Sequence, residues 1–372
     1  MTKNHSHDKK SSQSNPKITR TILNDIRRGG FKRTLRQDFR DIYYFYLDQE
    51  TRERLSHMGR IKKWIFLVIW ILKSLILKLA PTRRILLVVS LILIFISGNY
   101  TTSNDVNVSL NIDRLGYLLL LIILMLELKD KWLAQDELAV GRAVQNALLP
   151  HQNPILDGWE IWLYTQPANE VGGDLVDYIS LNKNKLGLAL GDVAGKGLGA
   201  ALLMAKLQAT LRAIVRNFRS LAELGAQLNE IFCRDGIPNR FASMIYIQLE
   251  SGSGLVRLLN AGHMPPIVMR QQKLEEMAPG APALGINLEA RYVEQSAELK
   301  PGDVLIVYSD GLTEARNDRD EFFGEKRLLN LLPRLVDLSP EKMGIRLLNA
   351  VENFIGDARR SDDLSLIILK KI

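Results

Sequence analysis

Four acidic positions lie beside apolar runs that are typical of β-strands. Asp174 closes the segment VGGD and Asp192 lies in LALGDVAGKG, whereas Asp310 lies in LIVYSDG and Asp362 comes just before the run LSLIIL. Strands that share a core bring such ends to one edge of a sheet. Carboxylates with no neighbouring Cys or His suit the hard cations Mg²⁺ or Mn²⁺ better than zinc. Two such ions would neutralise a phosphate group and lower the pKa of a bridging water for in-line attack at phosphorus.

The elements that must position these acids begin near residue 159. Apolar runs with strand spacing predict strands at 159–164, 186–190, 242–249, 255–258, 267–270 and 304–308. Apolar residues at helical spacing predict helices at 200–217, 221–232, 326–335 and 341–354. Strands come in runs with helices grouped between them, so the pattern predicts an α+β fold with a largely antiparallel sheet.

Five segments occur in a characteristic order: VGGDLVDY, GDVAGKGLGAALLMA, NAGHMPPIVM, GDVLIVYSDGLTEARN and SDDLSLIIL. Together with the preceding AVQNALLP, this set resembles the metal-dependent protein serine/threonine phosphatases (PPM, protein phosphatase 2C type), and within them the bacterial SpoIIE-like branch of sigma-factor partner switching. The resemblance covers residues 134–372. It implies an antiparallel β-sandwich flanked by α-helices over 151–372, with two Mn²⁺ or Mg²⁺ ions at one edge.

The resemblance also implies roles for single residues. Asp192 would bridge both metal ions, and the Val193 carbonyl would help to hold one of them. Asp174 would bind one ion directly or through water, while Asp310 and Asp362 would ligate the other. These four aspartates would be the catalytic residues of a phosphatase.

Other residues would support this set without binding metal: Gly173, Gly195, Lys196, His263, Gly311 and Asp363, the last standing where the wider family often has Asn. Lys196 precedes a predicted helix and could attract phosphate, although a solvated loop lysine accounts for it more simply. No His follows the Asp-Gly pair at 310–311, and no Arg is evident as a phosphate clamp. The resemblance therefore leaves the leaving-group acid and the phosphate anchor unassigned.

The N-terminal third has a different character. Residues 1–84 hold 20 Lys/Arg against 7 Asp/Glu, a net charge of +13 that leaves −5 for the rest of the chain. We expect a basic, partly disordered region over 1–60 and a membrane region over 61–128, because the apolar runs show no regular polar face. Segment 64–79 contains Lys73, Lys78 and two Trp, so we predict that it lies on the membrane surface or crosses the membrane. Segments of about 85–101 and 113–128 are predicted to span the membrane.

Basic residues flank the two predicted spans on one side: Arg83 and Arg84 before the first, Lys129 and Lys131 after the second. The positive-inside rule then places both termini and the phosphatase-like domain in the cytoplasm, at a multi-pass inner membrane. This arrangement favours the membrane, and not nucleic acid, as the partner of the basic region.

Residues 129–150 predict a linker helix with near-heptad apolar spacing, which either dimerises or packs on its own domain. The expected protein partner is a phosphorylated substrate, which the resemblance implies is a STAS-type anti-sigma-factor antagonist.

Two other functions stay open at this point. One is a non-catalytic membrane scaffold that keeps the phosphatase-like fold. The other is a nucleotide cyclase, suggested by the GGD at 172–174. The single cysteine, Cys233, excludes a disulfide scaffold and a Cys-cluster zinc site.

Overall fold

The computed structural model describes residues 47–56, 58–96, 99–101, 107–109, 112–236 and 240–372. These residues divide into two compact units, 1–130 and 131–372, which are called the N-terminal unit and the C-terminal unit below. The long helix α6 contributes to both.

The N-terminal unit contains the helices α3 (Gln49–Ser56), α4 (Arg60–Lys78) and α5 (Pro81–Ile96), a short hairpin β1 (Asn99–Thr101) and β2 (Asn107–Ser109), and the start of α6 (Ile112–Leu148). Pro81 is the first residue of α5, where its fixed φ and missing N–H favour a helix start. Helix α5 ends at Ile96, and 99–101 form a strand, so the predicted extension of this helix to residue 101 is wrong. The prediction for 1–46 lies outside the described residues.

The predicted second span and the predicted linker form one continuous helix, α6. No proline occurs between Ile112 and Leu148, and the charged residues near 129–131 are compatible with helix on an exposed face. The helix ends two residues before Pro150, as predicted from the restriction that proline places on the preceding residue.

Helices α5 and α6 pack closely at Gly116. A Cβ at this position would lie 2.7 Å from Ile94 Cγ1 and 2.8 Å from the Ser90 carbonyl oxygen. Ser90 is fully buried, and its hydroxyl donates to the Leu87 carbonyl at 2.8 Å. Small residues at a helix contact let two backbones approach, which is common in membrane helix pairs and occurs in other helix pairs as well.

Among the described residues, one segment is long and apolar enough by composition to cross a membrane, Leu198–Asn217. It lies in the C-terminal unit, where Leu203, Leu207 and Leu211 are buried against a sheet. The predicted spans do not meet that criterion. Helix α5 has 16 residues, about 24 Å of helix, where a bilayer core is about 30 Å thick. Helix α6 is long enough, but charged residues lie close to both ends of its apolar run: Asp113, Arg114, Glu127 and Lys129.

The C-terminal unit is built on two five-stranded antiparallel sheets. The first has the order β10-β7-β6-β5-β4 and the second β3-β12-β11-β8-β9. The strands are β3 (Trp159–Gln166), β4 (Leu175–Asn182), β5 (Lys185–Val193), β6 (Ala242–Glu250), β7 (Leu255–Ala261), β8 (Ile267–Arg270), β9 (Lys273–Glu276), β10 (Glu294–Glu298), β11 (Val304–Tyr308) and β12 (Leu364–Lys371).

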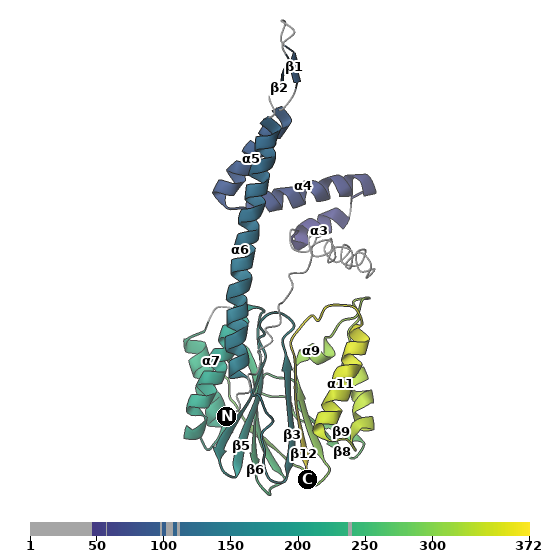
Figure 1. Ribbon diagram of the computed structural model, residues 1–372. Coiled ribbons are helices and arrows are strands. Elements are labelled where there is room, and N and C mark those ends of the chain that lie inside the picture. The colour runs from purple at the N-terminus through teal and green to yellow at the C-terminus, as the bar shows by residue number, and fades with distance from the viewer. Residues whose placement is uncertain (1–46, 57, 97–98, 102–106, 110–111, 237–239) are drawn as a thin grey trace, which may run out of the picture. The chain divides into compact units, whose positions relative to one another are not determined.

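Helices cover the outer face of each sheet, which gives four layers (Figure 1). Helices α7 (Leu198–Ile214) and α8 (Leu221–Arg234) pack on the first sheet. The helices α9 (Asp310–Thr313), α10 (Glu325–Leu331) and α11 (Pro340–Ile355) accompany the second, with short 3₁₀ turns following α7 and α10. In β6, Met244 and Tyr246 face the helices, while Ile245 and Ile247 face the other sheet. Both faces are buried, which is why the middle of this strand, 244–247, is apolar.

Every predicted strand and helix of the C-terminal unit is present, and the predicted antiparallel α+β class is confirmed. The strands that sequence patterns missed are β4, β9 and β10. Strands β9 and β10 lie at sheet edges and carry few apolar residues. Strand β4 contains a fully buried acid, Asp177, whose two oxygens accept from the Arg212 guanidinium at 2.6 and 2.7 Å.

Gly344 and Gly141 give a matched test of this packing, since both lie inside helices. A Cβ at Gly344 of α11 would overlap the buried ring of Trp162, whereas one at Gly141 of α6 would meet its nearest atom at 3.8 Å. We expect Gly344→Ala to lower the free energy of unfolding of the C-terminal unit by about 1–3 kcal/mol. Gly141→Ala should leave it unchanged or raise it by up to about 1 kcal/mol. Urea unfolding of the full chain in detergent measures both, and equal effects would contradict the packing described.

Candidate active site

Strand register brings the four predicted aspartates to one edge of the sandwich. Leu175 at the start of β4 pairs with Gly191 near the end of β5, so the flanking Asp174 and Asp192 are neighbours. In the second sheet, β11 runs antiparallel to β12, so the end of one strand, before Asp310, lies beside the start of the other, after Asp362. Antiparallel pairing thus joins acids that are far apart in sequence, as for Asp310 and Asp362.

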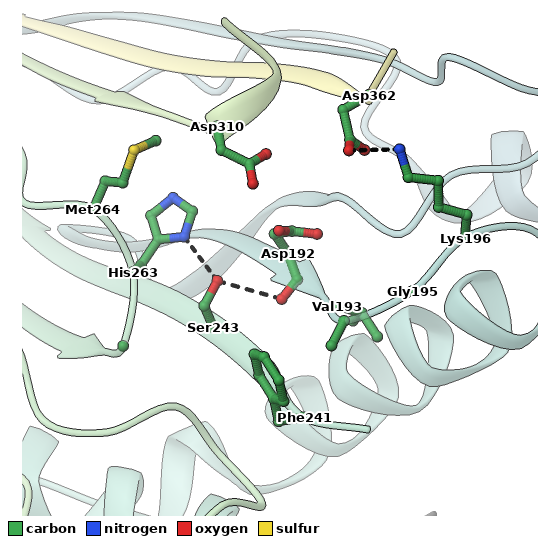
Figure 2. A pocket seen from close by; sticks show the side chains of 12 residues that line it. Asp192, Val193, Gly195, Lys196, Phe241, Ser243, His263, Met264, Asp310 and Asp362 are labelled. Carbon is green, nitrogen blue, oxygen red and sulfur yellow. Dashed lines mark hydrogen bonds and ion pairs between the residues drawn. The ribbon is translucent and has the colours of Figure 1, made fainter. Parts of the chain in front are cut away.

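A cavity of about 370 Å³ opens at this edge (Figure 2). The carboxylates of Asp192, Asp310 and Asp362 line it, together with the predicted Val193, Gly195, Lys196 and His263. Sequence reasoning missed Phe241, Ser243 and Met264, which also line the cavity. Phe241 and Ser243 lie in a segment that carries no motif of its own, whereas Met264 follows His263 within NAGHMPPIVM, where a methionine gave no signal of a chemical role.

Mutual repulsion and burial shape the electrostatics of the acids. Burial, followed by the charge of Asp192, raises the pKa of Asp174 well above its usual range. Burial, followed by the charge of Asp362, also raises the pKa of Asp192. For Asp310, burial and the charges of Asp192 and Asp362 raise the pKa to about 6. All three side chains therefore have an electrostatic need for positive charge.

The donors fit a divalent cation by their chemistry. They are all oxygens, and Asp174 Oδ2 is buried with no hydrogen-bond partner. Among the residues that the structure describes, no three Asp, Glu, His or Cys side chains are already grouped as a complete metal site. A bound cation would relieve the repulsion that raises the pKa values of these acids.

Asp363 holds the backbone around Asp174. One carboxylate oxygen accepts from the Ala168 N–H at 2.8 Å and the other from the Gly173 N–H at 2.6 Å. A Cβ at Gly173 would lie 3.2 Å from the Val193 carbonyl oxygen, and one at Gly311 would overlap the Asp363 carbonyl oxygen. The glycines are therefore needed where the segments that carry the acids approach one another.

His263 connects the two sheets beneath the cavity. Its Nε2 lies 3.2 Å from the Tyr308 carbonyl oxygen, at the end of β11, and its Nδ1 lies 2.9 Å from Ser243 Oγ, on β6. A carbonyl oxygen can only accept, so Nε2 carries the proton and Nδ1 accepts from the serine. Burial lowers the pKa of His263 to about 4, which keeps the ring neutral. Ser243 Oγ also lies 3.3 Å from the Asp192 carbonyl oxygen (Figure 2), but its single proton can be donated to only one of these two acceptors at a time.

Helix α6 also contacts the site through a residue that sequence reasoning missed. The buried Gln145 side chain donates to the Gly172 carbonyl at 2.8 Å and accepts from the Gly172 N–H at 3.0 Å. The GGD segment at 172–174 is thus held as a turn between Gln145 and Asp363. A glutamine within a helix gives no sequence signal for such a contact.

The family model described as Stage II sporulation protein E (SpoIIE) matches residues 182–371, more than half of the chain. The chain belongs to the SpoIIE family. Among curated relatives, protein IcfG of Synechocystis is 27% identical over 259 residues, which are 62% of this chain and 41% of that protein. Phosphoserine phosphatase RsbU of Bacillus subtilis is 23% identical over 239 residues, or 64% of this chain and 70% of RsbU. The matched region thus spans about two fifths of the length of IcfG and 70% of the length of RsbU.

Solved structures show the same fold. The SiaA-PP2C domain of Pseudomonas aeruginosa aligns with a TM-score of 0.56 and 17% identity, over 65% of this chain and 98% of that domain. The PP2C phosphatase domain of SpoIIE from Bacillus subtilis, with a fragment of its regulatory domain, aligns with a TM-score of 0.52 and 17% identity, over 59% and 64%. The C-terminal unit of this SpoIIE-family chain therefore has the PP2C-type fold that the sequence motifs imply.

The raised pKa of Asp310 predicts how stability depends on pH when metal is removed. Its folded-state pKa of about 6 lies above the ordinary 3.8, so the folded protein binds the proton more tightly than the unfolded chain. That stabilisation is present below the ordinary value and is lost as pH rises through about 6. In EDTA, we expect the unfolding temperature of Asp310→Asn to fall less than that of the wild type between pH 4 and 7.

The exposed Asp337 supplies the control, since Asp337→Asn should keep the wild-type pH dependence. Differential scanning fluorimetry in EDTA measures all three proteins. Equal pH dependence of Asp310→Asn and the wild type would contradict the electrostatic description of this carboxylate.

Proposed function

We propose that this protein is a metal-dependent phosphatase that removes phosphate from phosphoserine or phosphothreonine on a protein. The observation that carries the proposal is the cavity at which both sheets present carboxylates whose pKa values are raised by burial and mutual repulsion. The similarity to the phosphoserine phosphatase RsbU supports the same reaction.

In this proposal, Asp192 would contact two metal ions with the help of the Val193 carbonyl, Asp174 would hold one ion directly or through water, and Asp310 and Asp362 would hold the other. Mg²⁺ or Mn²⁺ held there would lower the pKa of a bound water, the nucleophile, and would offset negative charge on the phosphate. The chain itself supplies the orientation of the donors: Asp363 fixes the backbone of Asp174, and His263 links the strand ends that carry Asp192 and Asp310.

We further propose that the substrate is a phosphorylated STAS-type anti-sigma-factor antagonist. Membership of the SpoIIE family supports this choice. A phosphoseryl STAS protein offered beside an unrelated phosphoserine protein tests it: preference for the STAS protein supports the proposal, and equal turnover of both contradicts it.

Removing single carboxylates tests the reaction. We expect Asp192→Asn and Asp310→Asn each to lower metal-dependent phosphate release by about 100-fold or more, because each removes a charged donor worth several kcal/mol to the metal-stabilised transition state. Asp157→Asn, at an exposed position, should keep wild-type activity. Phosphate release from a phosphoseryl protein by the full chain in detergent, with and without Mn²⁺, measures all four proteins. A wild type without turnover would instead favour a non-catalytic scaffold.

The N-terminal unit leads us to propose membrane anchoring, with the C-terminal unit in the cytoplasm. Large apolar side chains are exposed along α4, α5 and the first part of α6, including Trp64, Ile92, Phe95, Leu121 and Met125. An apolar surface of this extent needs to be covered, and lipid covers it without a further partner. Arg83 pairs with Glu127 and Asp130, which closes the α5/α6 pair at the end where positive residues gather.

Charge placed on this apolar surface tests the membrane proposal. We expect Ile92→Arg with Leu121→Arg to shift the chain out of the membrane fraction, because an Arg at the centre of a span costs about 2.5–3.5 kcal/mol on insertion scales. Leu288→Arg with Val293→Arg, at exposed apolar positions of the C-terminal unit, should leave the distribution unchanged. Carbonate extraction followed by vesicle flotation measures the distribution, and a wild type that stays in the extract would overturn the proposal.

Exposed residues on the later part of α6, Trp132, Leu133, Val140 and Val144, support a homodimer through this helix. Disulfide cross-linking of a Val140→Cys variant in vesicles tests it, because a paired helix brings the two cysteines together. Absence of cross-linking would contradict a dimer at this position.

A further inference from the structure

We propose that Lys196 is the phosphate anchor of this site, binding a non-bridging phosphoryl oxygen of the substrate through its ammonium group. This inference rests on the proposed function and names a group that the family resemblance leaves unassigned. It comes from the position of Lys196 on the wall of the carboxylate-lined cavity.

Lys196 is the one Lys or Arg among the described residues that line the cavity. The other polar lining side chains are the acids Asp192, Asp310 and Asp362, with Ser243 and the neutral His263. A phosphate monoester carries up to two negative charges and would enter a cavity whose own side chains are mainly negative. A positive side chain at the wall therefore adds to the attraction for phosphate of any cation that the carboxylates hold.

The Lys196 ammonium is already directed to this wall. Its Nζ donates to Asp362 Oδ2 at 2.8 Å and to the Ser361 carbonyl oxygen at 2.6 Å (Figure 2). An ammonium has three N–H donors, so these contacts leave one for a ligand. The Lys196 side chain is 57% exposed, so a ligand that enters the cavity can reach it without unfolding the loop.

Two glycines and an arginine fix the backbone of the loop that carries Lys196. Gly195 (φ +116°) and Gly197 (φ +72°) stand on either side of Lys196 in conformations that side chains rarely adopt. On one side the Arg240 guanidinium donates to the Ala194 carbonyl at 2.6 Å and fills the space that a Cβ at Gly195 would occupy.

An ion pair with Asp362 as the whole purpose of Lys196 is a weaker explanation. The pair is largely exposed, and exposed ion pairs contribute little to stability. The two explanations differ in what Lys196 affects: an anchor affects phosphate binding, whereas a residue that only positions Asp362 affects metal binding.

The test compares Lys196→Met, Lys196→Arg and the wild type as full chains in detergent, with p-nitrophenyl phosphate as substrate and inorganic phosphate as inhibitor. The control is Lys185→Met, which removes a half-buried lysine paired with Glu250 at the opposite end of β5. We expect Lys196→Met to raise KM and the inhibition constant of phosphate about 10-fold or more, as loss of a charge-assisted hydrogen bond predicts. Lys196→Arg should recover most of that loss, and Lys185→Met should match the wild type.

A second readout does not depend on turnover. With Mg²⁺ present, inorganic phosphate should raise the unfolding temperature of the wild type and of Lys185→Met, and this rise should be lost in Lys196→Met. An unchanged phosphate inhibition constant in Lys196→Met, with a shifted metal concentration for half-maximal activity, would overturn the anchor and assign Lys196 to positioning Asp362. A wild type that binds phosphate through Lys196 but releases none from substrates would overturn the proposed function and leave the anchor standing.

Discussion

The repulsion among buried carboxylates at one edge of the sandwich is the constraint on which the rest of the C-terminal unit depends. Asp174, Asp192 and Asp310 come from two sheets and are held where burial and neighbouring charge raise their pKa values. An isolated group of this kind destabilises the fold unless a cation joins it. The surrounding structure therefore has to hold the strand ends in place. Three buried hydrophobic clusters, which pack the sheets against each other and against the helices, supply this stabilisation.

Three contacts show how the fold opposes this repulsion. Asp363 is paired with backbone N–H groups and so fixes the turn before β4. His263 connects β6 to the end of β11, and the register of each sheet then fixes the separation of the acids within it. Gln145 connects α6 to the same turn. A change in the position of α6 within the C-terminal unit would thus alter the hydrogen bonds to Gly172, in the turn that carries Asp174.

Positive charge is distributed sparingly around the cavity. Lys196 lies on the wall and Arg240 lies behind the loop, where its guanidinium is used by a backbone carbonyl. This arrangement keeps the acids available to a hard cation and leaves the Lys196 ammonium on the cavity wall. A dense set of arginines would instead neutralise the carboxylates and compete with metal for them.

The local features of this protein could be predicted from its sequence. They are the α+β class, most strands and helices of the C-terminal unit, the apolar helices of the N-terminal unit, and the acids at strand ends. These follow from apolar periodicity and from glycines beside acids, which are properties of neighbouring residues. The edge strands β9 and β10 were not predicted because few of their side chains are buried. The end of α5 was not predicted because an apolar run alone does not fix where a helix ends.

Contacts between residues far apart in sequence could be identified only from the tertiary structure. Strand register brought Asp174 to Asp192, two sheets brought these to Asp310 and Asp362, and packing added Ser243, Phe241 and Gln145 to the site. It also placed His263 between the sheets and Lys196 on the cavity wall. Such contacts depend on how layers pack across the core, and that packing leaves no periodic signal along the chain.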